Sequence, residues 1–152
     1  MTTKNKNQPH QPKWLSDLQV FLMRHTHSAL NHQNMIITTT EPKTGHQHAE
    51  PITYIHDGQD YIAISLGRSD WYMNARANPR VRLEVDGKKF DAFAEPVSTQ
   101  TPDDTRQVLD VLARERPDLY KSIFGLTYKT PSDEDVIKIQ KRIGFIRFCP
   151  MR

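Results

Sequence analysis

The chain has 152 residues, with 21 Lys and Arg against 18 Asp and Glu, a formal net charge of +3 and a pI near 9.0. This length is typical of one domain that buries about two-thirds of its unfolded surface. The mild positive charge suits a phosphorylated or carboxylated ligand, but it is too small by itself to indicate a nucleic-acid partner. The single cysteine, Cys149, excludes an intrachain disulfide and is compatible with a reducing compartment.

No apolar run approaches the ~20 residues that a membrane-spanning helix needs. The polar segment 1–13 also lacks the apolar core of a secretory signal. We therefore expect a disordered tail over 1–13, one domain over 14–150, no integral membrane segment and a cytoplasmic location.

Apolar residues from Trp14 to Leu30 follow helical spacing and predict an amphipathic helix that covers a sheet. Alternating or β-branched runs predict six strands, over 35–40, 48–56, 61–65, 81–85, 88–96 and 143–148. Further helices are predicted over 71–77, over 102–116 with Val108, Leu109 and Leu112 facing inward, over 117–124, and from Thr130-Pro131 onward.

Short turns such as Asp57-Gly58 and Asp86-Gly87 connect most of the predicted strands, as in β-hairpins. Strands do not alternate with helices in the way a doubly wound parallel sheet requires. The fold class is therefore α+β, mainly antiparallel β, with a small barrel or sandwich and flanking helices.

Signatures of covalent catalysis are missing from the sequence. Ser65-Leu66-Gly67 lacks the glycine that precedes the serine of a nucleophile elbow, and no P-loop, dinucleotide-binding glycine triplet or Cys-x-x-Cys pair is present. If the protein is an enzyme, we expect its reactive chemistry to come from a bound cofactor.

Histidines are concentrated before residue 57, and His46 and His48 have the strand spacing that two metal ligands would need. No third ligand stands nearby, so no metal site is predicted. Surface or turn histidines, some of them touching a ligand anion, are the better interpretation.

Two turns carry groups that can bind an anion. Lys43-Thr44-Gly45 combines a glycine turn, a hydroxyl and a charge, the parts of a small anion nest, although an ordinary hairpin turn is the more frequent alternative. Gly67 and Arg68 precede the helix at Trp71, where an arginine and the helix dipole can hold a phosphate or carboxylate. Together the two turns favour a shared anionic ligand.

Trp71 and Tyr72 open this helix. In one interpretation, one of the two rings packs into the core and the other covers the barrel end. In the other interpretation, a flat aromatic ring lies beside a planar ligand, and Asn74 forms a hydrogen bond with the ligand's edge.

Over residues 36–97 the chain resembles the deazaflavin-dependent nitroreductase family. The segments that match the family pattern, in order, are Thr38-Thr39-Thr40, Lys43-Thr44-Gly45, Pro51, Asp57-Gly58, Ser65-x-Gly67 and Trp71-Tyr72-x-Asn74-x-x-Ala77-Asn78-Pro79. The resemblance implies a six-stranded split β-barrel of the FMN-binding type with flanking helices.

The resemblance also implies a cofactor, coenzyme F-420, an 8-hydroxy-5-deazaflavin. Its phosphate and glutamate tail would meet Lys43, Thr44 and His48, and its ring would lie near Pro51, Ser65, Trp71 and Asn74. The full set of expected cofactor-binding residues is Lys43, Thr44, Gly45, His48, Pro51, Ser65, Gly67, Arg68, Trp71, Tyr72 and Asn74.

Family members pass a hydride from the reduced deazaflavin to a quinone, a nitroaromatic or a similar small acceptor. No catalytic residue is assigned; Tyr54, Tyr72 and Tyr120 are candidates for positioning or protonating the acceptor. Glu41-Pro42 stands where the family has Gly-Arg, and His48 where it has arginine. Two alternatives therefore stay open: an FMN-dependent relative and a non-catalytic ligand-binding protein. Split barrels of this type are often dimers, so a homodimer is a candidate assembly.

Overall fold

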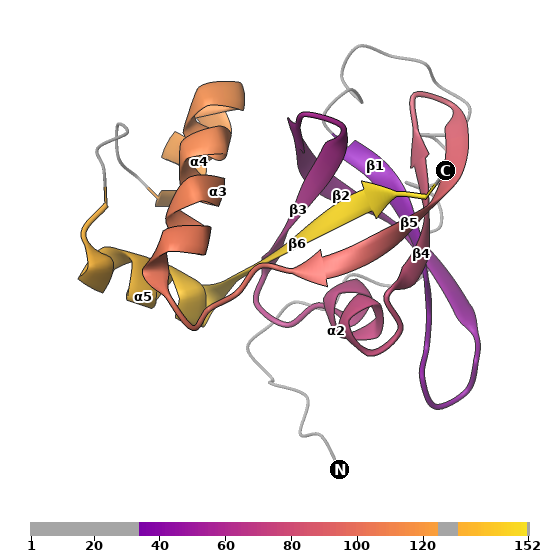
Figure 1. Cartoon of the computed structure of the whole chain (residues 1–152). Coiled ribbons are helices and arrows are strands. Elements are labelled where there is room, and N and C mark those ends of the chain that lie inside the picture. The colour runs from indigo at the N-terminus through magenta and orange to yellow at the C-terminus, as the bar shows by residue number, and fades with distance from the viewer. Residues whose placement is uncertain (1–33, 125–130, 152) are drawn as a thin grey trace.

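The computed structural model describes residues 34–124 and 131–151. The expected tail over 1–13 and the helix expected from Trp14 to Leu30 lie outside these residues. Figure 1 shows the described part as a barrel with three helices on one side and one helix at its lower end.

Antiparallel pairing joins six strands into a closed barrel in the order β1-β2-β3-β6-β5-β4, and β4 closes onto β1. The predicted six-stranded barrel with flanking helices is confirmed. Each predicted strand is present, close to its predicted bounds. The strands are β1 (Asn34–Thr40), β2 (Gln47–Asp57), β3 (Asp60–Leu66), β4 (Arg80–Val85), β5 (Lys88–Pro96) and β6 (Ile143–Pro150).

Alternate side chains of each strand fill the barrel. Ile37 on β1 lies opposite Leu83 on β4, and both are fully buried in the interior cluster. Helix α2 (Asp70–Ala77) adds Trp71 and Ala75 to the same cluster, so this helix closes one end of the barrel. The period-two alternation read from the sequence is therefore the alternation between interior and exterior.

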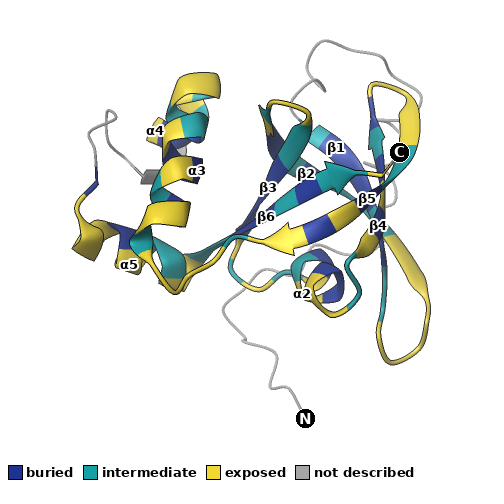
Figure 2. Ribbon diagram, viewed as in Figure 1, coloured by how far each residue is buried: buried dark blue, intermediate teal, exposed yellow. Residues whose placement is uncertain are grey.

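A second core lies outside the barrel, where β2, β3 and β6 turn apolar residues toward the helices. Helices α3 (Pro102–Glu115), α4 (Pro117–Phe124) and α5 (Asp133–Arg142) cover this face (Figures 1 and 2). The three residues of α3 that were predicted to face inward are all buried there. The cluster comprises Ile55, Ile62, Ile64, Val108, Leu109, Leu112, Tyr120, Val136 and Phe145.

Helix α5 starts later than the sequence predicts. The expected start at Thr130-Pro131 is wrong because Ser132 is the N-cap residue, and its hydroxyl accepts a hydrogen bond from the Asp135 N–H at 3.2 Å. The Asp135 carboxylate accepts in return from the Ser132 N–H at 3.4 Å, which completes a capping box.

Replacement of Leu109 by alanine tests the outer core. Leu109 is fully buried, so Leu109→Ala should lower the free energy of unfolding by about 2–5 kcal/mol through lost burial and a residual cavity. Leu66→Ala is the matched control, since Leu66 is 68% exposed and its truncation should change stability by less than about 0.5 kcal/mol. Urea unfolding of both variants measures the difference, and equal losses would contradict the assignment of this core.

Candidate functional site

The β1–β2 turn, where the cofactor tail was expected, satisfies much of its own hydrogen bonding. Gly45, at φ 74°, donates its N–H to the Glu41 carbonyl at 2.9 Å, and Glu41 donates to the His46 carbonyl at 2.8 Å. The His46 N–H donates to the Thr44 hydroxyl at 3.2 Å. Three N–H groups of the turn therefore have partners inside it, and an anion bound here would depend mainly on the Lys43 ammonium.

A carboxylate lies among the predicted tail contacts. The Glu41 carboxylate oxygen Oε2 lies 3.2 Å from Nε2 of His48. Hydrogen bonds from the His48 and Thr44 side chains lower the pKa of Glu41, so this carboxyl is ionised at neutral pH. The negative charge of Glu41 offsets the positive charge that Lys43 brings to the turn.

The residues expected at the ring end close the barrel. The buried Ser65 hydroxyl donates to the Gly67 carbonyl at 2.8 Å and lies 2.7 Å from the Ser69 hydroxyl. The buried Asn74 amide donates to the Thr39 hydroxyl at 3.3 Å. Trp71 is 6% exposed and packs in the barrel interior, as the core-packing interpretation holds.

Pro51 and Tyr72 are more accessible. Pro51 lies half-buried on β2, opposite Ile36 of β1. Tyr72 is also half-buried, and its ring packs against Gly144: a Cβ added at Gly144 would lie 2.5 Å from the Tyr72 ring. Tyr72 thus covers the start of β6 while Trp71 points inward.

Glu50 is a half-buried carboxyl that the sequence analysis missed. It precedes Pro51 and shares the strand parity of Ile52 and Tyr54, which point into the barrel. Its carboxylate accepts a hydrogen bond from the Trp71 backbone N–H, while its Oε1 atom is enclosed and has no partner among the described residues. Burial, with a smaller effect of Asp70, raises the pKa of Glu50. The alternation of β2 was the signal that could have placed Glu50 inside.

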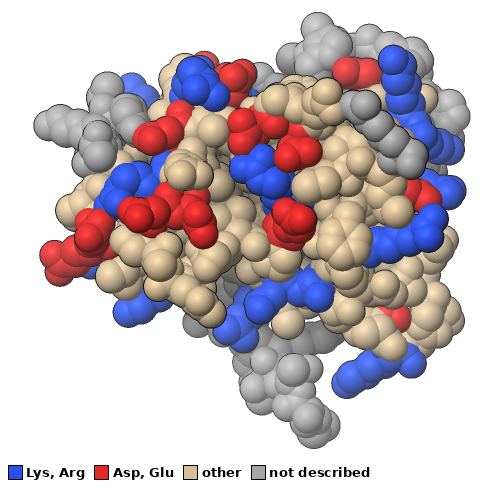
Figure 3. All heavy atoms as spheres, viewed as in Figure 1, with Lys and Arg blue, Asp and Glu red and all other residues tan. Residues whose placement is uncertain are grey.

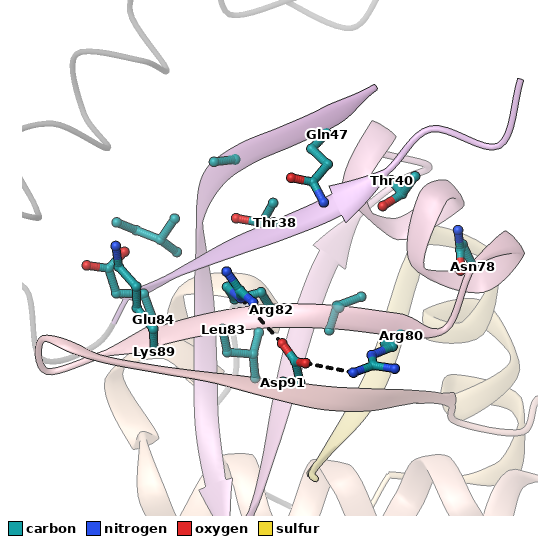
Figure 4. A pocket seen from close by; sticks show the side chains of 13 residues that line it. Thr38, Thr40, Gln47, Asn78, Arg80, Arg82, Leu83, Glu84, Lys89 and Asp91 are labelled. Atoms are coloured by element: carbon teal, nitrogen blue, oxygen red, sulfur yellow. Dashed lines mark hydrogen bonds and ion pairs between the residues drawn. The ribbon is translucent and has the colours of Figure 1, made fainter. Parts of the chain in front are cut away.

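A groove of about 620 Å³ lies on the outer face of β1 and β4 (Figure 4). Thr38 and Thr40 of β1 border it on one side, and Arg80 and Arg82 of β4 on the other. Both arginines bind Asp91 of β5, at 3.0 and 3.3 Å, and they lower its pKa. Because Arg80 and Arg82 are already paired with Asp91, we expect this groove to bind an anion more weakly than two unpaired arginines would.

A second hollow, of about 380 Å³, lies between α2, the segment 96–99 and the junction of α5 with β6. We call it the basic pocket. It contains three expected site residues, Gly67, Arg68 and Tyr72. It adds three cations that the sequence analysis missed, Arg76, Lys141 and Arg142, and no Asp or Glu lines it.

Lys and Arg atoms gather on the surface over α2 and toward the end of α5 (Figure 3). The Gly67 N–H donates to the Arg142 carbonyl at 2.9 Å, which ties the loop carrying Arg68 to the end of α5.

The three candidate tyrosines lie in different places. Tyr54 is buried inside the barrel and Tyr120 in the helical cluster, and burial raises the pKa of both hydroxyls. Only Tyr72 of the three lines the basic pocket.

Over residues 34–124 and 131–151, no three or more His, Cys, Asp or Glu side chains are grouped to hold a metal ion. Among the helices of the described part, none is long and apolar enough to cross a membrane.

A family model described as F-420H(2)-dependent quinone reductase matches residues 22–125. Because this match covers more than half of the chain, the protein belongs to that family, and the resemblance seen in the sequence is confirmed. An F-420H(2)-dependent quinone reductase of Mycobacterium tuberculosis is 33% identical over 78 residues, which make up 48% of this chain and 52% of the relative. The chain thus spans about half the length of the curated relatives it matches.

Solved structures support the fold. HutZ, described as a heme storage protein from Vibrio cholerae, superposes with a TM-score of 0.57 at 13% identity, over 90% of this chain and 91% of that one. An F-420-H(2)-dependent reductase, FDR-A, gives a TM-score of 0.53 at 18% identity, over 76% and 93%. At such identities the likeness shows the barrel fold alone.

The Glu50 carboxyl yields a pH-dependent prediction. The pKa of Glu50 is higher in the folded protein than in the unfolded chain. The contribution of this carboxyl to the stability of the fold is therefore fully present below the ordinary pKa of 4.5, where the group is protonated, and it is lost as the pH rises through the raised pKa. Glu50→Gln should therefore raise the melting temperature at about pH 7 and leave it unchanged at about pH 3.5. Each kcal/mol of stability gained by removing the buried charge corresponds to a rise of roughly 2–4 °C in the melting temperature.

Glu95→Gln is the control, because Glu95 is an exposed carboxylate on β5. Thermal unfolding followed by circular dichroism at both pH values makes the comparison. A loss of stability in Glu50→Gln at neutral pH would show that the charged carboxylate is needed beside α2.

Proposed function

We propose that this protein is an oxidoreductase that transfers a hydride from reduced coenzyme F-420 to a quinone, a nitroaromatic or a similar small organic acceptor. The observation that carries this proposal is the match of residues 22–125 to the quinone reductase family. The M. tuberculosis relative that shares part of this region is named for the same cofactor and acceptor class.

The charge of the described surface supports a ligand with an anionic tail. Arg68, Arg76, Lys141 and Arg142 line one hollow without a carboxylate among them. Coenzyme F-420 carries a phosphate and glutamate carboxylates, which such cations bind through charge-assisted hydrogen bonds. Among the expected contacts, Lys43, Arg68 and Tyr72 are on the surface or half-buried, and we propose that they touch the cofactor directly.

The buried members of the expected set act by positioning. Ser65 and Asn74 hold the Gly67 loop and α2 through their hydrogen bonds, and Trp71 anchors α2 in the barrel. When bound, the reduced deazaflavin supplies the hydride, so the protein needs no nucleophile of its own. A cofactor that supplies the hydride and a protein that positions the reactants agree with the absence of covalent-catalysis signatures from the sequence.

Tyr72 is the tyrosine that we propose to position the acceptor. It lines the basic pocket beside the expected cofactor residues Gly67 and Arg68. Arg76 lies over its ring, 5.6 Å from the ring centroid, and holds the ring by a cation–π contact.

An FMN-dependent oxidoreductase is the second candidate function. The observation that favours it is the contact of the Glu41 carboxylate with the His48 ring, at 3.2 Å, in the turn where a long anionic tail was expected. FMN carries a single phosphate and has less need of cations at that turn. A homodimeric assembly and a cytoplasmic location stay predictions.

Titration of the purified protein with reduced coenzyme F-420 and with FMN tests the function. We expect coenzyme F-420 to bind with a Kd in the micromolar range or below, at least about tenfold tighter than FMN, a difference of about 1.4 kcal/mol. Addition of menadione to the reduced complex should then oxidise the deazaflavin, which absorbance and fluorescence follow.

Selective binding of FMN would support the second candidate. Failure of both cofactors to bind at high micromolar concentration would leave the non-catalytic alternative. Menadione mixed with reduced coenzyme F-420 without protein controls for direct reduction.

A further inference from the structure

We infer that the basic pocket is the principal anion-binding site of this protein. In this assignment Arg68, Arg76, Lys141 and Arg142 bind the phosphate and carboxylate groups of the cofactor tail, in preference to the β1–β2 turn. The assignment to the tail rests on the proposed function.

The pairing of charges distinguishes these cations from several arginines elsewhere on the surface. Arg80 and Arg82 bind Asp91, Arg106 binds Asp103 and Asp133, and Arg147 binds Asp57 and Asp60. By contrast, within residues 34–124 and 131–151 none of the four cations of the basic pocket has an ion-pair partner. Four like charges around one hollow repel each other, and a bound anion relieves that repulsion.

Helix dipoles explain only part of this arrangement. Arg76 lies in the last turn of α2, and Lys141 and Arg142 lie in the last turn of α5, where the dipole favours cations. The dipoles do not explain why the ends of two different helices face one hollow together with Arg68. They also do not explain the absence of a carboxylate from its lining.

Backbone and ring contacts fix the walls of the pocket. The hydrogen bond from the Gly67 N–H to the Arg142 carbonyl links the Arg68 loop to α5. Tyr72 packs on Gly144, where even a methyl group would clash with the ring, so α2 lies against the start of β6. Two regions that are distant in the sequence, 67–76 and 141–144, therefore hold their cations around one site.

The size of the pocket fits part of a cofactor. A volume of about 380 Å³ is near the lower end of ligand pockets. It accommodates a phosphate with a short chain, while the planar ring would extend beyond it. The uncharged lining includes hydroxyl and amide groups of Thr99, Thr105 and Gln140 beside the apolar Val97 and Phe145.

The β1–β2 turn is the competing location, and it is less suited to an anion. Its Gly45 and His46 N–H groups have partners within the turn. The ionised Glu41 carboxylate stands beside His48 in the same turn as Lys43, so a second anion would be repelled there.

Binding measurements on matched variants test the assignment. The probes are coenzyme F-420 and a tail-free deazaflavin that keeps the ring and the ribityl chain but has no phosphate. The variants are Lys141→Ala/Arg142→Ala, Lys43→Ala for the turn, and Lys138→Ala as a control from the exposed part of α5 outside the pocket. Circular dichroism checks that each variant is folded.

We expect the double variant to bind coenzyme F-420 roughly 10- to 100-fold more weakly than the wild type, with less than about a twofold change for the tail-free probe. Lys43→Ala should have a smaller effect than the double variant, and Lys138→Ala should match the wild type. The wild-type affinity should fall as the salt concentration rises, and this dependence should be weaker in the double variant.

A larger effect of Lys43→Ala than of the double variant would overturn the inference, as would a double variant that binds like Lys138→Ala. If the wild type binds neither deazaflavin, the proposed function fails and the assignment to its tail fails with it. Inorganic pyrophosphate then tests the pocket alone. A melting temperature raised by pyrophosphate in the wild type but not in the double variant supports an anion site, and no rise in the wild type overturns it.

Discussion

The closure of the barrel by α2 is the constraint on which the candidate site depends. Trp71 and Ala75 enter the interior, and Asn74 donates to Thr39 at the end of β1. A barrel end left open would expose the apolar interior to water, so this helix is needed for the fold. Its position also decides where Tyr72 and Arg76 lie on the surface.

The turn before α2 is fixed by short polar contacts. Ser65 is the last inward-facing residue of β3, and its hydroxyl bonds to both the Gly67 carbonyl and the Ser69 hydroxyl. Ser69 holds the N-cap position, but its hydroxyl binds Ser65 and does not cap the helix. The first turn of α2 instead has the Glu50 carboxylate as a partner for the Trp71 N–H. Partial burial of the Glu50 carboxyl is unfavourable, but its hydrogen bond to the Trp71 N–H offsets this cost, because an unpaired N–H at the start of α2 would also be unfavourable.

Much of the fold followed from local patterns. The alternation of Val81, Leu83 and Val85 predicted one buried face of β4, and the structure buries all three. Turn signals such as Asp86-Gly87 were equally clear, because both residues have positive φ. The start of α5 was missed because a cap depends on which hydroxyl reaches the helix, and Thr130 and Ser132 are equivalent by residue type.

The candidate site was less predictable, because its residues meet only through long-range pairing. Arg142 lies close to Gly67 because β3 pairs with β6, which brings Leu66 opposite Ile143. No spacing along the sequence reports that contact. Glu50 was missed for another reason: a carboxyl is normally exposed, and only the parity of β2 places it inside.

The family motif has a double role in this chain. Trp71 and Asn74, which carried much of the resemblance, are buried and hold α2 in place. A motif of this kind reports where the planar ligand of the family would lie, because the residues that close the barrel also shape the surface above it. It is less informative about the anionic tail, since contacts with solvent-exposed phosphates can be supplied by any cation that the fold brings near. In this chain those cations come from the ends of α2 and α5, and two of them, Lys141 and Arg142, lie far along the sequence from the motif.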